Sequence, residues 1–296
     1  MVDLRQPDWI DLGERTTLPM DAALDKAFAE IGVAKLGGAS KGRGWSWYDK
    51  LQHCPYLYKR LYLDKALSGA VSANALEIGS GFHALKALYH QSQIPGSGVE
   101  YGHVGRMRDA LYKHNASVQA VAEAARLIEA YIAYYDNDYL IPLDVEVHAV
   151  DDEGNSCRYD LIARVEDAHP GLMPGTYIVE AKTASRMDDA TMTGWRNHGE
   201  IIGQAAIFHR TRLAKKYGRL EGVIVDVVTK TKQPGFCRPV VVLPREVERA
   251  HLQDLRMWRT LEKLYRSTGY WPRARAACIA RYGKCAMFDE CSRAEG

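Results

Sequence analysis

The stretch YIVEAK, residues 177–182, alternates apolar and polar side chains and decides how the middle of this chain folds. A period of two is typical of a β-strand, because successive side chains point to opposite faces of a sheet. Glu180 and Lys182 are therefore expected on one face, with Val179 and Ala181 on the other. The pattern places a carboxylate and an ammonium group side by side.

Two stretches before it carry the same alternation, LDVEVHAV at 143–150 and SCRYDLIARV at 156–165. The segments between the three strands, DDEGN and EDAHPGLMPG, hold the Asp, Gly, Asn and Pro residues that turns require, so we expect antiparallel hairpins. Farther along the chain, GVIVDVVT at 222–229 and CRPVVVL at 237–243 predict two more strands.

Helical periodicity surrounds these strands. Apolar and aromatic residues recur every three or four positions from Ser46 to about Gln91, Asn115 to Tyr135, about Ala190 to Tyr217, and about Glu246 to Thr268. Strands flanked by helices predict an α/β fold with a central mixed β-sheet and a helical layer. The expected organisation is a flexible amino-terminal arm at 1–44 and one domain at 45–296, divided into a helical part at 45–140, a core at 141–245, and a carboxy-terminal helix with a tail at 246–296.

The composition narrows the class of protein. Hydrophobic residues make up 47% and charged residues 26% of the 296 residues, as in soluble globular proteins. No apolar run approaches the roughly 18–20 residues that cross a bilayer, and the first ten residues contain no apolar signal core. We therefore expect a cytoplasmic protein without a membrane partner. The formal charge of +2 neither requires nor excludes a polyanionic partner.

Asp160 adds a second carboxylate to the face that carries Glu180. A hairpin can bring the two groups opposite each other, and facing carboxylates repel unless a cation neutralises them. Such oxygen ligands favour Mg²⁺ or Mn²⁺, beside which Lys182 could orient a water molecule and stabilise charge on a phosphoryl oxygen. The alternative is a solvated strand face with an ordinary surface salt bridge, the commoner arrangement for an isolated Glu-x-Lys motif.

The order of motifs along the chain favours the metal site. Asp160, a loop, Glu180-x-Lys182 and a following helix with Gln204 resemble the PD-(D/E)XK nuclease superfamily, and especially its RecB-like iron–sulfur exonuclease branch. Phage exonucleases and CRISPR-associated adaptation nucleases are of this type. The further matching pieces are the entry segment Trp45 to Arg60 with Cys54-Pro55, the helical motif Gly79-x-x-x-His83, the carboxylate Glu146, YDLIAR at 159–164 and EAKT at 180–183.

This resemblance covers about Trp45 to Cys291 and implies a restriction-endonuclease-like core. It implies metal ligation by His83, Asp160, Glu180 and the backbone carbonyl of Ala181, and a water-orienting role for Lys182. Gln204 would contact the DNA or the lysine. The family usually has tyrosine four residues after this glutamine, whereas this chain has Phe208, so the role of that position is open. Glu146 is open between supporting the metal ligands and lying on the hairpin surface.

Six cysteines are too few for a disulfide framework in a chain of this length, so metal binding or burial is expected. Cys278, Cys285 and Cys291 lie close together in sequence but are one ligand short of a four-sulfur site. The resemblance implies that Cys54 supplies the fourth thiolate of a [4Fe–4S] cluster, and structural Zn²⁺ is the alternative. Cys157 and Cys237 have no matching partners and are expected to be ordinary core or surface thiols.

Together these features predict a metal-dependent DNA nuclease, and more specifically an exonuclease of recombination, repair or phage DNA processing in a bacterial or phage-infected cell. The expected partners are DNA with a free or single-stranded end and a recombination or replication protein. A structure-dependent or restriction-type endonuclease with the same site, and a non-catalytic DNA-binding scaffold, remain alternatives. Five cations between Arg210 and Arg219 could follow a phosphate backbone or simply form a solvated helix end.

Overall fold

The fold is seen in a computed structural model that describes residues 43–66, 74–99, 117–136, 138–280, 283–285 and 287–293. The expected flexible arm at 1–44 lies outside these ranges except for its last two residues. No described helix is both long and apolar enough to cross a membrane.

The described strands form a central mixed sheet and a separate two-stranded ribbon. β1, β2 and β3 follow one another as an antiparallel meander, and β4 then joins β3 in parallel. β5 and β6 both pair antiparallel with β4. The strands of the central sheet are β1 (Ile141–Val150), β2 (Ser156–Val165), β3 (Gly175–Ala184), β4 (Leu220–Thr229), β5 (Phe236–Cys237) and β6 (Val240–Val241).

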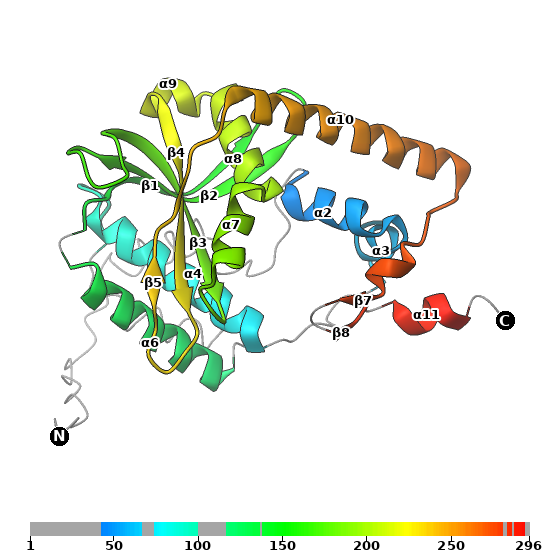
Figure 1. Cartoon of the computed structure of the whole chain (residues 1–296), viewed down its shortest axis with the longest axis horizontal. Coiled ribbons are helices and arrows are strands. Elements are labelled where there is room, and N and C mark those ends of the chain that lie inside the picture. The colour runs from blue at the N-terminus through cyan, green and yellow to red at the C-terminus, as the bar shows by residue number, and fades with distance from the viewer. Residues whose placement is uncertain are drawn as a thin grey trace.

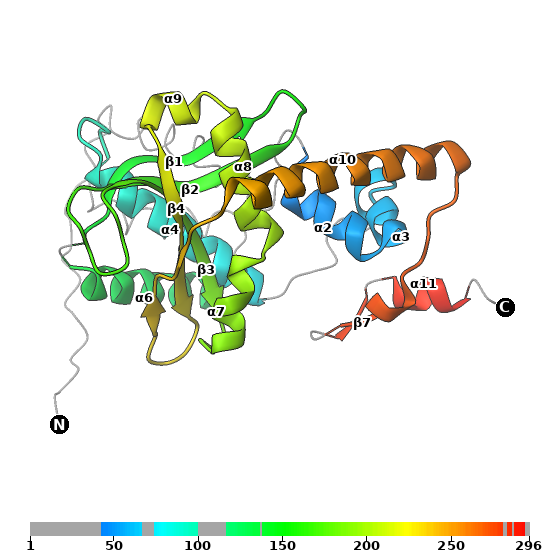
Figure 2. The same cartoon turned by 45° about the horizontal axis from the view of Figure 1, so that its top comes forward.

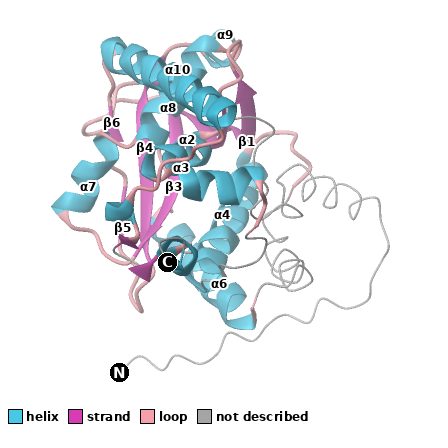
Figure 3. Ribbon diagram, turned by 90° about the vertical axis from the view of Figure 1, so that its right-hand side faces the viewer, coloured by secondary structure: helices cyan, strands magenta, loops and turns pink. Residues whose placement is uncertain are grey.

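Helices cover both faces of this sheet. α4 and α7 lie on opposite sides of the strands (Figure 3). One layer consists of α4 (Asn74–Gln93) and α6 (Val118–Tyr134), which pack on each other and bury a cluster that includes Leu85 and Leu127. The other layer consists of α7 (Asp189–Arg196), α8 (Gly199–Arg210) and α9 (Leu213–Tyr217). The core of the domain lies between α8 and the sheet, where residues such as Ile178 and Phe208 are fully buried.

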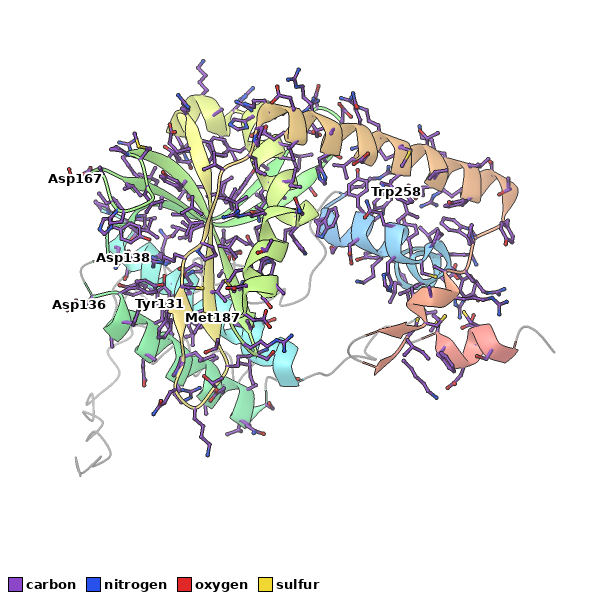
Figure 4. All side chains as sticks on the ribbon, in the orientation of Figure 1. Tyr131, Asp136, Asp138, Asp167, Met187 and Trp258 are labelled. Atoms are coloured by element: carbon purple, nitrogen blue, oxygen red, sulfur yellow. The ribbon has the colours of Figure 1, made fainter. Side chains whose placement is uncertain are left out.

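α10 (Arg245–Thr268) extends from α8 toward the amino-terminal helices (Figures 1 and 2). Trp258 of α10 points toward these helices and contacts two hydrophobic clusters, to which α2 and α3 contribute Tyr48, Leu51 and Tyr58 (Figure 4). These amino-terminal helices are α2 (Trp45–His53), α3 (Pro55–Tyr58) and the π-helix η2 (Lys59–Leu63). The chain then returns to α3 through a tail built of η4 (Arg275–Ala277), β7 (Ile279–Ala280), β8 (Gly283–Lys284) and α11 (Phe288–Arg293).

Three segments differ from the elements expected from sequence. The helical stretch expected from Ser46 onward is interrupted at Cys54, whose extended backbone separates α2 from α3. The helix expected over about 190–217 is three helices, because His198 and Thr211 adopt extended backbone conformations that interrupt it. The strand expected over 237–243 is two short strands on either side of Pro239, whose missing N–H cannot join a ladder. Its carbonyl instead accepts a hydrogen bond from the N–H of Val225 at 2.9 Å.

A buried polar group fastens the α4–α6 layer to the sheet. Asp226 on β4 accepts hydrogen bonds from Lys86 at 2.7 Å and from the Tyr131 hydroxyl at 2.6 Å. Arg238 donates to the Tyr131 hydroxyl at 2.7 Å and forms a two-pronged ion pair with Asp138. The charges therefore alternate in sign through the interior, which is the condition under which such burial is tolerated.

Candidate active site

Glu180 and Lys182 lie on the face of β3 that α8 covers. Lys182 Nζ donates to Glu180 Oε1 at 2.6 Å and to Glu200 Oε2 at 2.7 Å. Gln204 Nε2 donates to the other oxygen of Glu180, Oε2, at 2.6 Å. The structure thus brings together three residues that the sequence indicated and adds Glu200.

Asp160 joins this group where β2 and β3 part. The two strands are paired up to Leu161 and Val179, and beyond this pair no further β2–β3 partners follow toward Asp160. The backbone N–H of Ala181 donates to Asp160 Oδ2 at 2.9 Å. Because the strands separate here, a side chain can replace a strand as the acceptor for that N–H.

His83 reaches the same point from α4. Its Nδ1 lies 3.4 Å from Asp160 Oδ2. Gly79 lies one turn earlier, where a Cβ would come within 3.3 Å of the Thr183 hydroxyl, so a glycine lets α4 approach β3 closely. Burial lowers the pKa of His83 to about 4, which leaves the imidazole neutral at pH 7 and able to donate a lone pair.

Glu146 lies on β1 next to the site, with a positive φ of 52°. The ladder pairs Val145 with Leu161 and Val147 with Tyr159 and skips Glu146, so the strand is locally irregular there. Its carboxylate forms an ion pair of 2.8 Å with Arg158 and is nearly buried, with only 7% of the side chain exposed. The structure therefore places Glu146 near the carboxyl groups of Asp160 and Glu180, and not on the open surface of the hairpin.

The pKa values of the four carboxyl groups at this site are shifted in different directions. These groups, called the acidic cluster below, belong to Asp160, Glu180, Glu200 and Glu146. Burial, together with the charge of Glu180, raises the pKa of Asp160 to about 7 and that of Glu200 to about 7. Burial and the charge of Asp160 raise the pKa of Glu146 to about 8. For Glu180, burial alone would raise the pKa, but Lys182 and Gln204 outweigh it and leave the pKa below its ordinary value. The cluster holds more carboxyl groups than its cations neutralise.

Among the described residues, no three His, Cys, Asp or Glu side chains converge closely enough to hold a metal ion as they stand. At the active site, the two oxygens of Glu180 accept hydrogen bonds from Lys182 and Gln204. His83 lies beside Asp160. Ala181 contacts the carboxylate of Asp160 through its backbone N–H, and not through the carbonyl that the resemblance implied as a ligand.

Phe208, near the end of α8, is fully buried in the core between this helix and the sheet. Its ring meets that of Tyr159 edge-on, with 6.3 Å between the centroids. The Tyr159 hydroxyl donates to the backbone carbonyl of Gln204 at 3.1 Å. A tyrosine hydroxyl therefore does contact the segment of α8 that carries Gln204, but it comes from β2.

Glu200 is a site residue that the motifs did not single out. It stands four residues before Gln204, so both face β3 from one side of α8. A carboxylate and an amide at this spacing, soon after a Glu-x-Lys strand, are the signal that could have identified it.

The four cysteines implied for a cluster line one small pocket between α3 and the tail. Cys54 caps the start of α3, where its sulfur accepts from the N–H of Leu57 at 3.5 Å. Cys285 is joined to Cys278 by a backbone hydrogen bond of 2.8 Å. Burial raises the pKa of Cys291, and the other three thiols add to that effect. Cys157 and Cys237 lie elsewhere, against the α8 side of the sheet.

The basic group after α8 is largely paired with acids. Arg210 contacts the turn between β1 and β2 through Asp151, Asp152 and Glu153. The other ion pairs are Lys216 with Asp144 and Arg219 with Glu221. Three of the five cations therefore hold local structure together, which favours the solvated helix end over a phosphate-binding surface.

Comparison with known proteins shows a likeness to solved structures. No protein-family model matches the chain, and no curated protein is significantly similar to it. The solved structure of a "putative exonuclease" from Eubacterium rectale aligns with a TM-score of 0.51 at 13% identity, over 94% of each chain. At this identity the likeness concerns the fold. The chain has a nuclease-like α/β fold, a central mixed sheet flanked by helices, as the sequence predicted.

Proposed function

We propose that this protein is a metal-dependent deoxyribonuclease that acts as an exonuclease. The observation that carries the proposal is the meeting of Asp160, Glu180 and Lys182 at the point where β2 and β3 separate. Two carboxylates beside an ammonium group are suited to hydrolysis of a phosphodiester, in which negative charge must be neutralised. The likeness in fold to a protein named as an exonuclease supports the same conclusion.

The donor set is chemically suited to a hard divalent cation, since it offers carboxylate oxygens and one imidazole. Burial first, and the charge of neighbouring carboxylates second, raise the pKa values of Asp160 and Glu146. A cation among these groups would offset both contributions. His83, Asp160, Glu180 and the carbonyl of Ala181 would hold Mg²⁺ or Mn²⁺. When bound, the ion supplies an activated water and neutralises charge on the phosphate.

The other parts of the reaction fall to side chains already in place. Lys182 can donate from its ammonium group to the attacking water or to a phosphoryl oxygen, where it stabilises the charge that develops in the transition state. Gln204 fixes one oxygen of Glu180, and the N–H of Ala181 fixes Asp160. These hydrogen bonds set the orientation of both carboxylates before substrate arrives.

For the cysteine pocket we propose a structural [4Fe–4S] cluster ligated by Cys54, Cys278, Cys285 and Cys291, with Zn²⁺ as the rival occupant. Four thiols around one pocket support it, since both kinds of site use four sulfur ligands. The pocket joins the amino-terminal helices to the tail, so its occupant would stabilise the fold and leave the chemistry to the site on β3.

The proposed substrate is DNA with a free or single-stranded end, met during recombination, repair or phage DNA processing in the cytoplasm. We also expect a recombination or replication protein as a partner. Assays of the purified protein on end-labelled linear DNA and on covalently closed circles, with Mn²⁺, Mg²⁺ or chelator, test the proposal. Shortening of linear DNA alone supports an exonuclease, and cutting of the circle indicates an endonuclease. No cleavage of either DNA in both metals would contradict the proposed function.

A further inference from the structure

The Glu180–Lys182 pair on β3 faces a second pair, Glu200 and Gln204, on α8. Two residues along a strand advance by about 6.6 Å, and four residues along a helix advance by about 6.0 Å. The two pairs therefore match in length. Lys182 contacts Glu200, and Glu180 contacts Gln204, like two rungs between the strand and the helix.

As a result, Lys182 contacts two carboxylates, those of Glu180 and Glu200. Its Nζ lies 2.6 Å from Glu180 and 2.7 Å from Glu200, and the Trp195 ring centroid is 5.8 Å away. Only 18% of the Lys182 side chain is exposed, and 29% of the Glu200 side chain. At such partial burial an ion pair is screened less than an exposed one and can hold a side chain in one position.

Glu180 has competing uses. Its oxygens are taken by Lys182 and Gln204, while the proposed function asks Glu180 to ligate a cation as well. If Glu180 were the sole anion beside Lys182, the cation and the ammonium group would compete for the same carboxylate. Glu200 removes this conflict because it gives Lys182 an anchor on α8.

We infer that Glu200 is a positioning residue that holds the Lys182 ammonium group on α8, so that Glu180 can bind a cation without losing the lysine beside it. This inference rests on the proposed function and deepens it. Glu200 acts through Lys182 and does not itself ligate the ion.

A double-mutant cycle tests this role. Glu200→Gln, Lys182→Met and the double variant are compared with the wild-type protein for Mn²⁺ binding, read from the electron paramagnetic resonance signal of free Mn²⁺. With Lys182 present, Glu200→Gln should weaken Mn²⁺ binding about tenfold, because the ammonium group then rests on Glu180 alone. In the Lys182→Met background the same change should have no effect, since no ammonium group competes.

Glu246→Gln is the matched control. Glu246 also lies in the first turn of a helix and is also ion-paired, to Arg249 at 2.5 Å, but at the start of α10. Its replacement should leave Mn²⁺ binding and cleavage unchanged. Glu200→Gln should in addition lower kcat for cleavage by about a hundredfold with little change in KM, and Glu200→Asp should restore part of that loss.

Each result decides the matter. Equal weakening of Mn²⁺ binding by Glu200→Gln in both backgrounds would make Glu200 a direct ligand and overturn the inference. Mn²⁺ binding that Glu200→Gln leaves unchanged even when Lys182 is present would overturn it as well. If the wild-type protein binds no Mn²⁺, the proposed function fails separately. Unfolding midpoints of the four proteins in metal-free buffer then judge the anchor: non-additive effects support it, and additive effects refute it.

Discussion

Asp160 accepts a hydrogen bond from the backbone N–H of Ala181, with 2.9 Å between oxygen and nitrogen, at the end of the pairing between β2 and β3. The contact links the carboxylate of one strand to the backbone of the next, between the two residues of the Glu-x-Lys motif. A shift of one strand along the other would therefore displace Asp160 from Glu180, so strand register and site geometry depend on each other.

Asp160→Ala, Glu180→Ala and Lys182→Ala should each reduce cleavage by at least about a hundredfold while the fold persists. Removal of either carboxylate weakens binding of the cation, and removal of the ammonium group withdraws stabilisation from the transition state. Cleavage of end-labelled DNA and circular dichroism measure the two effects. Asp144→Ala, which removes an acid from β1 that pairs with Lys216, is the control. Full activity of Lys182→Ala would contradict the assignment.

Activity in Mn²⁺ should equal or exceed activity in Mg²⁺, because a nitrogen donor such as His83 suits Mn²⁺ better than Mg²⁺. His83→Ala should lower the ratio of activity in Mn²⁺ to activity in Mg²⁺, since the remaining donors are oxygen atoms. Initial rates over a range of each metal, after removal of bound ions with chelator, measure both effects. An unchanged Mn²⁺ to Mg²⁺ ratio in His83→Ala would show that the imidazole does not meet the ion.

Replacing Cys54, Cys278, Cys285 or Cys291 by serine should each abolish the visible iron–sulfur absorption of anaerobically prepared protein and lower the unfolding midpoint. Cys157→Ser and Cys237→Ser, which lie away from the pocket, are the matched controls and should keep the absorption. Iron, sulfide and zinc contents identify the occupant. Zinc without iron would favour the rival site, and no metal in the wild-type protein would refute both.

Asp226→Asn should destabilise the protein by about 3–5 kcal/mol at pH 7, because it leaves Lys86 and Arg238 buried without a full counter-charge. Burial alone would raise the pKa of Asp226, but these two cations outweigh it and hold the pKa well below its usual range. Urea unfolding at several pH values measures the effect.

The lowered pKa of Asp226 also fixes the sign of the pH dependence. The stabilisation is fully present above the unfolded-state value of about 4 and is lost as the pH falls through the lower folded-state value. The wild-type protein should therefore lose stability below about pH 4 more steeply than Asp226→Asn. Parallel curves for the two proteins would show that the ion pairs contribute nothing.

Gly199→Ala should lower both stability and cleavage. A Cβ at Gly199 would overlap the indole of Trp45, which packs on the start of α8 just before Glu200. Overpacking of this kind costs about 1–3 kcal/mol. Gly194→Ala in α7, where a Cβ meets no atom within 4 Å, is the control and should stabilise the helix by up to about 1 kcal/mol. Equal unfolding midpoints for the two variants would contradict the packing argument.

The sheet could be predicted from sequence because alternation and turn residues are local signals. The meander around 143–182 follows from them directly, and the fold class is confirmed. The break at His198 has a local signal, Asn197 and Gly199, which helical periodicity alone does not register. The break at Thr211 has no proline or glycine beside it and could not be predicted from sequence. Tertiary packing decides that β4 lies parallel to β3.

Likewise, only part of the candidate site could be predicted from sequence. Glu180 and Lys182 share a face because of a two-residue period, whereas the role of Glu200 depends on how α8 is turned toward β3. The buried group around Asp226 left one trace in the sequence, a lone acid within an apolar strand, but its partners Lys86 and Arg238 come from distant segments. Metal ligation by His83 stays a prediction.

The two walls of the cysteine pocket determine when during synthesis the pocket can form. Tyr56 of α3 contacts Glu290 of the tail, 234 residues later in the sequence, so the two walls of the pocket are made at widely separated times during synthesis. On the ribosome, Cys54 emerges long before Cys285 exists. Domains fold largely as their segments emerge, so the pocket can close only after the tail through Cys291 has been made. The proposed metal can therefore bind only after the catalytic strands have emerged, and a chain shortened before Arg275 would lack one wall of the pocket.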